Sequence, residues 1–312
     1  MKKILPKVFL GVGAGLLAAG IFRKMREENK EKLIEEEQSV FIGKYIVDPS
    51  YVKEQFHDEN MILVDARTKK SVRKGTIEGA AAVNWQYLSN VEEAKKGDYD
   101  WGLILPKEKL SKRLGELGLS KDKEIVLFGS GSKEWGEDGR VLWTLRAAGY
   151  ENLKLVDGGY RGLKKAGLKT SRKPRRLEPV KVSIDEMDRS HIIDTRELES
   201  TIEQYKLIDV REDKEYKGAA LYGEAQGGRI PGAVQLKFID VFDKKDFLKS
   251  NEELAAFFEE AGLEKGDPII AYCTFGLRSA YMQLVMEMAG YDNVKNYDGS
   301  YATWCAHNPV EK

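Results

Sequence analysis

The chain has 312 residues, with 51 basic and 51 acidic side chains, so its formal net charge is zero. This length predicts about two domains, and the balanced charge gives no basic footprint of the kind that a nucleic-acid partner needs. Two cysteines, Cys273 and Cys305, are too few for a disulfide framework, and the three histidines lie at no metal-ligand spacing from them. We therefore expect no metal, no cofactor and no nucleic-acid partner.

The N-terminal segment carries a membrane signal. An uncharged run from Val8 to Phe22 is flanked by lysines and arginines. As a helix it covers ~22 Å, short of the ~30 Å hydrocarbon core, but Ile4 and Leu5 extend it. We expect residues 1–22 to be a membrane anchor, with a signal segment that ends at a weak small-residue site as the alternative. Positive charge on both flanks leaves the membrane side open, and we favour an extracytoplasmic location for the remainder of the chain.

Residues 23–40 are charged and helix-prone and predict a spacer, after which the chain repeats itself. Four segments recur in the same order, which indicates an internal duplication. They are MILVDAR (61–67) with YKLIDVR (205–211), GTIEGAAAVNW (75–85) with GRIPGAVQL (228–236), EIVLFG (124–129) with PIIAYC (268–273), and GYENLKLVDGGYRGL (149–163) with GYDNVKNYDGSYATW (290–304). The duplication predicts an N-terminal domain over 41–168, a linker over 169–180 and a C-terminal domain over 181–312.

Short β-branched runs alternate with helical patterns within each copy. The expected strands lie at 62–65, 125–128 and 153–156, and then at 207–210, 268–272 and 294–297. Residues 108–119 and 251–263 have apolar residues at helical spacing and end in Gly-Leu. This alternation predicts an α/β protein in which each domain is a parallel sheet with helices on both faces.

The order of the motifs is more specific than any single one of them. Both copies contain D-x-R and then G-x-I-x-G-A, followed by an apolar strand and a G-Y-x-N segment that leads into D-G-G or D-G-S. From about residue 44 to 312 this order resembles the tandem-domain rhodanese sulfurtransferases. The resemblance implies two rhodanese-like domains, with the active cysteine in the second and facing the first. We expect the D-x-R pairs, which include Asp209 and Arg211 near the site, to tie loops together.

The stretch AYCTFGLRSA places Cys273 between an apolar strand and a glycine-bearing turn into a helix. Parallel sheets build their sites at the carboxyl ends of strands. Backbone N–H groups of the turn and the N-terminus of the next helix can stabilise an anion, and Gly276 can adopt the positive φ that such a turn requires. The turn therefore favours a thiolate on Cys273 without a neighbouring base.

The resemblance implies that Cys273 takes a sulfane sulfur from thiosulfate or a related donor as a persulfide and passes it to a thiol or to cyanide. Arg278 is the candidate for binding the anionic donor. The alternative is a membrane-tethered persulfide carrier or redox-sensing module that acts with a protein partner. The loop expected to hold the thiolate and the persulfide consists of Thr274, Phe275, Gly276, Leu277 and Arg278. C-x4-R is one residue shorter than the C-x5-R loop of cysteine phosphatases, so we do not expect phosphatase activity.

Several positions depart from the family pattern. Gly129 replaces the cysteine in the first copy, where the segment up to the next helix is three residues longer, so we expect this copy to be catalytically silent. Glu215 stands where tandem sulfurtransferases typically carry an arginine that binds the donor, and Arg229 and Lys217 are the candidates for replacing that charge. Cys305 is expected to be a structural thiol, with resolution of the persulfide as the alternative.

Overall fold

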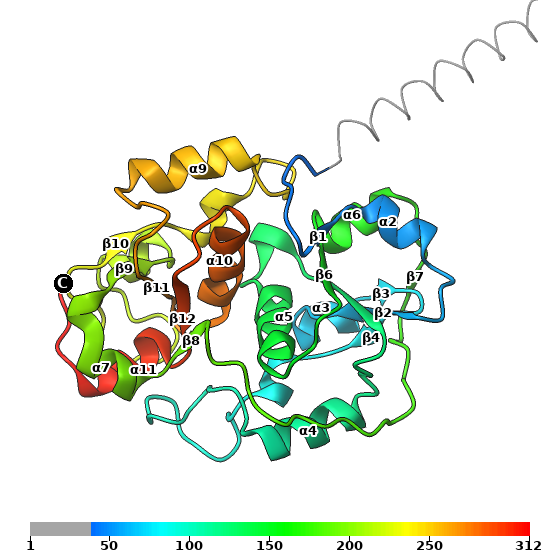
Figure 1. Ribbon diagram of the computed structural model, residues 1–312, viewed down its shortest axis with the longest axis horizontal. Coiled ribbons are helices and arrows are strands. Elements are labelled where there is room, and N and C mark those ends of the chain that lie inside the picture. The colour runs from blue at the N-terminus through cyan, green and yellow to red at the C-terminus, as the bar shows by residue number, and fades with distance from the viewer. Residues whose placement is uncertain (1–38) are drawn as a thin grey trace, which may run out of the picture. The chain divides into compact units, whose positions relative to one another are not determined.

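The computed structural model describes residues 39–312, which form one compact unit (Figure 1). The predicted anchor over 1–22 and nearly all of the predicted spacer over 23–40 lie outside the described residues. Within residues 39–312, no helix is both long enough and apolar enough to cross a membrane.

The N-terminal half contains a five-stranded sheet of order β1-β6-β5-β2-β4, in which every pairing is parallel. Its strands are β1 (Ile46–Val47), β2 (Met61–Asp65), β4 (Ala81–Ala82), β5 (Glu124–Phe128) and β6 (Leu153–Val156). Its helices are α2 (Pro49–Glu54), α3 (Lys69–Arg73), η1 (Trp85–Leu88), α4 (Lys107–Glu116), η2 (Gly131–Lys133), α5 (Glu137–Ala147) and α6 (Gly159–Lys165). A small antiparallel pair joins β3 (Thr76–Ile77) to β7 (Thr170–Ser171).

The C-terminal half repeats this topology with a parallel sheet of order β10-β9-β11-β12-β8. Its strands are β8 (Ile192–Ile193), β9 (Lys206–Asp209), β10 (Val234–Gln235), β11 (Ile269–Tyr272) and β12 (Val294–Tyr297). Its helices are α7 (Thr195–Thr201), η3 (Ile202–Gln204), α8 (Asp213–Tyr216), η4 (Phe238–Val241), α9 (Asn251–Glu260), α10 (Leu277–Met288) and α11 (Ser300–His307). The predicted α/β class and the two parallel sheets are confirmed, and the six expected strands begin and end within one residue of the observed ones.

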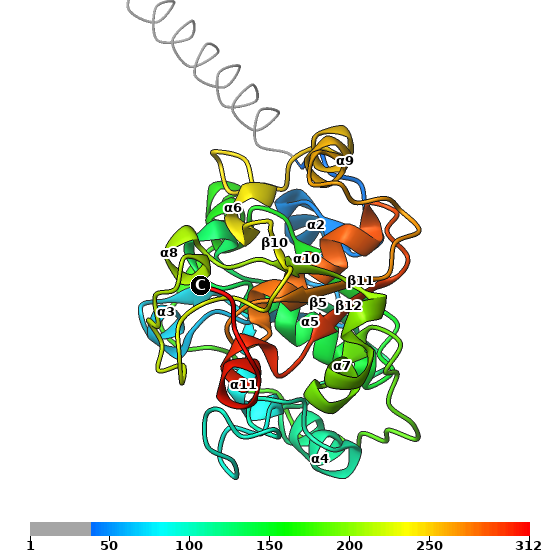
Figure 2. The ribbon, with the colours of Figure 1, turned by 90° about the vertical axis from the view of Figure 1, so that its left-hand side faces the viewer.

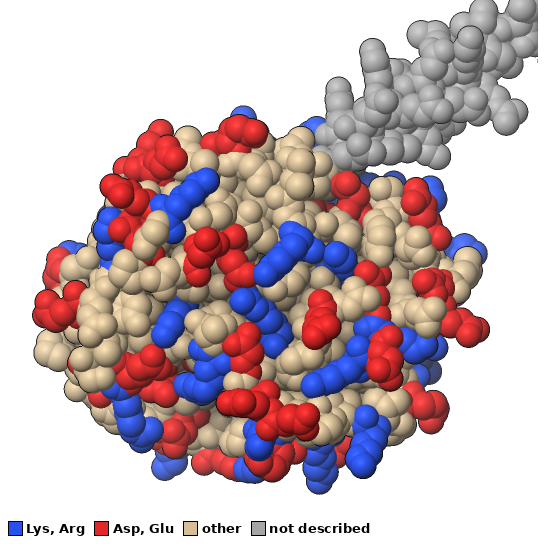
Figure 3. All heavy atoms as spheres, viewed as in Figure 1, with Lys and Arg blue, Asp and Glu red and all other residues tan. Residues whose placement is uncertain are grey.

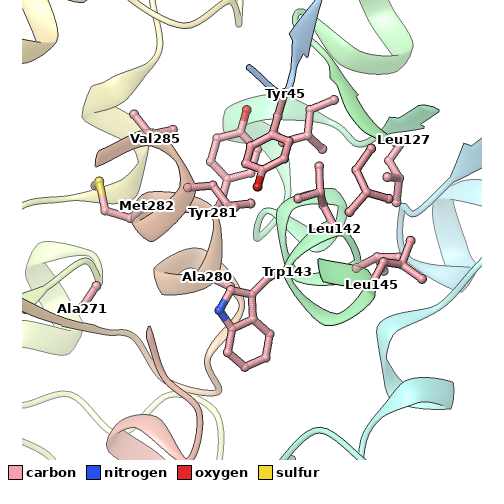
Figure 4. Packing of buried hydrophobic residues seen from close by; sticks show 14 of the residues in the cluster. Tyr45, Leu127, Leu142, Trp143, Leu145, Ala271, Ala280, Tyr281, Met282 and Val285 are labelled. Atoms are coloured by element: carbon pink, nitrogen blue, oxygen red, sulfur yellow. The ribbon is translucent and has the colours of Figure 1, made fainter. Parts of the chain in front are cut away.

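One buried cluster extends across both halves, and within it α5 and α10 lie side by side at the centre of the unit (Figures 1 and 2). Leu142 from α5 packs in the same buried cluster as Tyr281, Met282 and Val285 from α10 (Figure 4). The helices approach closely at Gly139, where a Cβ would lie 2.8 Å from the Cα of Tyr281. Because both helices are buried almost all round, they fix the two sheets relative to each other.

Charged side chains of both signs are interspersed on the face shown in Figure 3, consistent with the zero net charge.

At the carboxyl ends of the central strands, both α5 and α10 begin after a glycine in the left-handed region: Gly136 has φ 71° and Gly276 has φ 79°. Other residue types adopt such φ values only with strain, so these glycines set where each loop turns into its helix.

Candidate active site

Cys273 is the first residue after β11, the middle strand of the second sheet. Its amide donates a hydrogen bond to the Oγ of Ser300 (2.9 Å), and its carbonyl accepts one from the amide of Tyr301 (3.0 Å). The start of α11 therefore holds the cysteine in place, and only 1% of its surface is exposed.

The loop after Cys273 turns sharply at Gly276. A Cβ on this glycine would lie 2.7 Å from the carbonyl oxygen of Asp298, so no larger residue fits. Burial raises the pKa of the Cys273 thiol, but the Arg278 guanidinium and hydrogen bonds from Ser279 and from the backbone of the loop outweigh burial. The pKa of Cys273 therefore lies below its ordinary value, and the largest single contribution that lowers it is the charge of Arg278, followed by hydrogen bonds from the loop.

Arg278 is itself engaged by a buried carboxylate. Its Nη1 and Nη2 donate to the two carboxylate oxygens of Glu215 at 2.8 and 2.7 Å. The hydroxyl of Thr274 donates to Glu215 at 2.5 Å and accepts from Arg278 at 2.8 Å. Burial raises the pKa of Glu215, but these contacts outweigh it and hold the pKa below its ordinary value, so the pair is ionised. In the sequence pattern Glu215 stands only in the place of a missing arginine, yet in the structure its carboxylate holds the cysteine loop through Thr274 and Arg278.

A local sequence signal for Glu215 exists. It is the third residue of α8, and its side chain accepts a hydrogen bond from the amide of Glu212 at 3.1 Å, which completes a capping box. An acidic residue three positions after the cap is a known start signal for a helix. That signal places the carboxylate at a helix end, but it does not reveal that the same group reaches the loop of Cys273.

The second D-x-R pair lies beneath the site as a buried ion pair. The Nε and Nη2 of Arg211 donate to Asp209 at 2.9 and 2.6 Å, and Nη2 also donates to the carbonyl of Gly228 at 2.7 Å. The guanidinium lies 3.9 Å from the ring centroid of Tyr301. This pair thus links β9, the loop before β10 and α11. The first copy repeats the arrangement with Asp65, Arg67, Gly75 and Tyr160.

Arg229, Lys217 and Cys305, the other residues considered for the site, make none of the hydrogen bonds or ion pairs that hold the cysteine loop. Arg229 forms an ion pair with Glu311 in the C-terminal tail and lies over the ring of Tyr216. Lys217 follows α8 directly and is exposed. Cys305 is a buried free thiol whose Sγ contacts the carbonyl of Ala302, and burial raises its pKa.

Aromatic side chains from both halves surround the loop, and we call them the aromatic rim. The rim consists of Trp101 and Trp135 from the first half and Tyr222 and Phe275 from the second. The ring centroid of Phe275 lies 5.1 Å from that of Trp101 and 6.2 Å from that of Trp135, which is 4.6 Å from Tyr222. The Arg278 guanidinium lies 5.1 Å from the ring centroid of Trp135. No sequence motif marks these residues, so the rim could not be predicted from the sequence.

Arg140 of α5 joins the first half to the cysteine loop. It is fully buried, pairs with Asp298 at 2.6 Å, and donates to the carbonyls of Gly276 at 3.3 Å and Gly102 at 3.1 Å. The second carboxylate oxygen of Asp298 accepts from the amide of Ile104 at 2.9 Å. The cysteine loop is therefore held from both halves, as the resemblance implies for a site that faces the first domain.

Comparison with known proteins agrees with this arrangement. The sequence profile of the family described as "Rhodanese-like domain" matches residues 48–166 and, a second time, residues 188–307. The chain belongs to the rhodanese-like domain family.

Curated relatives extend over most of this rhodanese. A protein named putative thiosulfate sulfurtransferase 1, from Mycobacterium bovis, is 27% identical over 268 residues, which covers 83% of this chain and 94% of the relative. The sulfur carrier protein TtuD of Thermus thermophilus is 28% identical over 260 residues (79% and 85%). The thiosulfate sulfurtransferase of Rattus norvegicus is 28% identical over 228 residues (71% and 76%). These matches confirm the predicted class: a tandem rhodanese-type sulfurtransferase, which needs a sulfur donor and an acceptor.

Solved structures share the fold. The wild-type structure of EanB has a TM-score of 0.73 and 19% identity and covers 86% of this chain and 69% of its own. The anaerobic ergothioneine biosynthesis enzyme of Chlorobium limicola, solved with trimethyl histidine, has a TM-score of 0.72 and 20% identity (86% and 70%). At these identities the likeness concerns the fold alone.

In the first rhodanese domain, a carboxylate occupies the place that the Cys273 thiol has in the second. A Cβ added to Gly129 would lie 2.5–2.6 Å from the carboxylate atoms of Asp138. Asp138 and Arg278 are both the second residue of their helices, α5 and α10. Burial raises the pKa of Asp138 to about 6, although backbone N–H groups, including that of Gly129, partly offset it. The space available to the Cys273 thiol in one copy is thus filled by an acidic side chain in the other.

Proposed function

We propose that this rhodanese moves a sulfane sulfur from thiosulfate or a related donor to a thiol or to cyanide through a persulfide on Cys273. The observation that carries the proposal is the position of the Cys273 thiol at the end of the central strand, in a loop that begins a buried helix and beside the Arg278 guanidinium, whose charge lowers the pKa of the thiol. The names of the curated relatives from Mycobacterium bovis and Rattus norvegicus support thiosulfate as the donor.

The chemistry has two steps. The Cys273 thiolate attacks the outer sulfur of thiosulfate, the sulfur–sulfur bond of the donor breaks, and sulfite leaves with the electron pair. The acceptor then attacks the outer sulfur of the Cys273 persulfide, which releases the thiolate. Backbone N–H groups of residues 274–278 and the charge of Arg278 stabilise the negative sulfur in both states. The Glu215 carboxylate keeps Arg278 in place beside it.

Intact mass spectrometry after incubation with thiosulfate tests the proposal. We expect a gain of one sulfur atom, its loss on addition of cyanide, and no gain in Cys273→Ser. Cys305→Ser is the matched control, since it removes the other thiol, and it should still take up sulfur. Turnover retained in Cys273→Ser, or sulfur carried on Cys305, would contradict the assignment.

A second candidate function is a persulfide carrier that acts with a protein partner. It is favoured by the buried Glu215 carboxylate, which already neutralises the cation predicted to hold an anionic donor, and by the name of the Thermus thermophilus relative. Sulfur uptake from a persulfidated protein, with no uptake from thiosulfate, would select this alternative.

We also propose that the N-terminal segment anchors the enzyme in a membrane, with the rhodanese domains on the extracytoplasmic side. The uncharged run over 8–22, flanked by basic residues, supports an anchor. Protease shielding in intact cells and in spheroplasts tests both the attachment and the side.

A further inference from the structure

We infer that this site prefers a sulfur donor with an aromatic or apolar body and a single negative charge over inorganic thiosulfate, and that Glu215 and the aromatic rim set this preference. The inference rests on the proposed function and names the substrate class of the same cysteine. Two independent features carry it: the charge balance inside the loop, and the surface that covers the loop.

The positive charge of Arg278 inside the loop is already neutralised by the carboxylate of Glu215. Thiosulfate carries two negative charges, and a site for it needs cations that lack an anionic partner. Arg278 is 2% exposed, and both of its Nη atoms donate to the Glu215 carboxylate. A dianion that approaches Arg278 therefore also approaches a fixed carboxylate in a poorly solvated place, where like charges repel strongly. Arg229 does not supply a replacement, since it is paired with Glu311.

Aromatic surface and one lysine cover the loop. Phe275 packs with Leu277 and Ala302, and the other three rim residues lie against this cluster, partly buried. The exposed side chain of Lys96 reaches over the rim, with its Nζ 4.8 Å from the ring centroid of Phe275 and 2.5 Å from the carbonyl oxygen of Tyr222. Rings of this kind bind apolar and aromatic groups by stacking and edge contacts. The single positive charge of Lys96 beside these rings matches a donor with one negative charge.

Thiosulfonates test this preference because they present the same outer sulfur on different bodies. With benzenethiosulfonate, the Cys273 thiolate attacks the outer sulfur, the sulfur–sulfur bond breaks, and benzenesulfinate leaves with the electron pair. The product on Cys273 is the same persulfide that thiosulfate gives. Methanethiosulfonate has the same single charge but no ring, so the three donors separate the effect of charge from that of the ring.

The experiment measures kcat/KM for the three donors with the full-length protein and cyanide as acceptor. Each value is divided by the rate constant for uncatalysed sulfur transfer from the same donor to a small thiol. This division removes the differences between the donors in intrinsic reactivity. We expect benzenethiosulfonate to exceed thiosulfate by about tenfold or more, the effect of one good aromatic contact, with methanethiosulfonate between them.

Two variants assign the preference to its residues. Trp135→Ala should reduce the ratio of benzenethiosulfonate to methanethiosulfonate, whereas Trp135→Phe, which keeps a ring, should retain most of it. Glu215→Gln leaves Arg278 with a neutral partner and should raise the ratio of thiosulfate to methanethiosulfonate. Glu252→Gln, an exposed carboxylate on α9, is the control and should change neither ratio. Ratios are used because a loop that folds poorly lowers all three rates together.

The outcomes separate this inference from the proposed function. If no donor adds sulfur to Cys273, the proposed function fails. If thiosulfate is the best donor after normalisation, or if Trp135→Ala and Glu215→Gln leave both ratios unchanged, sulfur transfer stands and the present inference is overturned. Uptake from benzenethiosulfonate with little from thiosulfate supports both.

Discussion

The loops that follow β5 and β11 occupy the same place in the two halves and have the same backbone pattern. The helices that they lead into, however, carry side chains of opposite charge at their second residues. Each leaves the middle strand of a parallel sheet and ends at a left-handed glycine that begins a buried helix. In the second half, the second residue of the helix is Arg278, which lies beside a thiol. In the first half it is Asp138, which fills the space where a thiol would stand.

The comparison shows how two copies of one fold can place different groups at the end of the central strand. Backbone N–H groups at the end of a strand and the start of a helix attract a negatively charged group, and this attraction exists whether or not a substrate is bound. The second half uses them for a cysteine and supplies a cation. The first half satisfies them with its own carboxylate, that of Asp138.

The longer loop of the first half has also become part of the domain interface. α5 begins eight residues after Gly129, whereas α10 begins four residues after Cys273, and α10 is one residue longer (12 against 11). The first loop is therefore four residues longer than the second, one more than the three that the sequence predicts, because α10 begins one residue earlier relative to its end than α5 does. Asp246 from the second half inserts against this loop, where the hydroxyl of Ser132 donates to it and Arg161 lies 3.4 Å away.

The largest expected effect comes from exchanging the nucleophile between the loops. Cys273→Ser should abolish sulfur uptake, and adding Gly129→Cys to it should not restore any. The new side chain meets the Asp138 carboxylate, whose negative charge disfavours a thiolate, so it should be unreactive and should lower the melting temperature. Intact mass after incubation with donor and a thermal unfolding curve measure both effects. Sulfur found on position 129 would show that the two loops are chemically equivalent.

Breaking the ion pair of the second loop should cost about 3–5 kcal/mol of the free energy of unfolding, because Arg278→Met leaves the Glu215 carboxylate buried without its partner. The same change should raise the pKa of Cys273, which the Arg278 charge lowers. Urea unfolding and the pH dependence of alkylation of the thiol measure the two quantities.

The double variant Arg278→Met with Glu215→Met separates these roles. It should recover most of the lost stability, because no uncompensated charge remains, while the thiol stays less acidic than in the parent. A Cys273 pKa that is unchanged in both variants would assign the acidity to the backbone of the loop instead.

In the first loop, Asp138→Asn should stabilise the protein above about pH 6 by ~2–3 kcal/mol. Burial raises the pKa of Asp138 to about 6 from an ordinary 3.8, so the folded state prefers the protonated carboxyl. The stability that this group contributes is fully present below about pH 4 and is lost as the pH rises through about 6. An amide cannot ionise, so the variant should lose less stability than the parent between pH 5 and pH 8 in urea unfolding. An equal loss in both proteins would contradict the raised pKa.

The smallest effect is expected at the edge of the first loop. Arg161→Met removes an ion pair with Asp246, but the arginine side chain is 54% exposed, and such pairs contribute only ~0.2–1 kcal/mol. Urea unfolding at low and high salt should show a slight loss that salt removes. A loss of several kcal/mol would mean that Asp246 depends on this arginine for its place in the interface.

Much of the architecture could be predicted because it depends on local patterns. Apolar β-branched runs gave the strands to within one residue, and the repeated motifs gave two sheets of the same topology. The positive φ of Gly276 and the place of Cys273 at a strand end were also predicted, since a strand followed by a glycine turn leaves few alternatives. Arg229 shows the limit: its charge is visible in the sequence, but its partner, Glu311, is not.

The sequence by itself therefore determined the fold class, the duplication and the place of Cys273 at the end of the central strand. Only the tertiary structure decided which groups surround that cysteine. Glu215 meets Arg278 across 63 positions of the chain, and Trp135 reaches Phe275 from the other half. Hydrophobic periodicity and turn chemistry act between neighbours in the chain, whereas the pairing of distant charges and rings depends on how the two halves pack along α5 and α10.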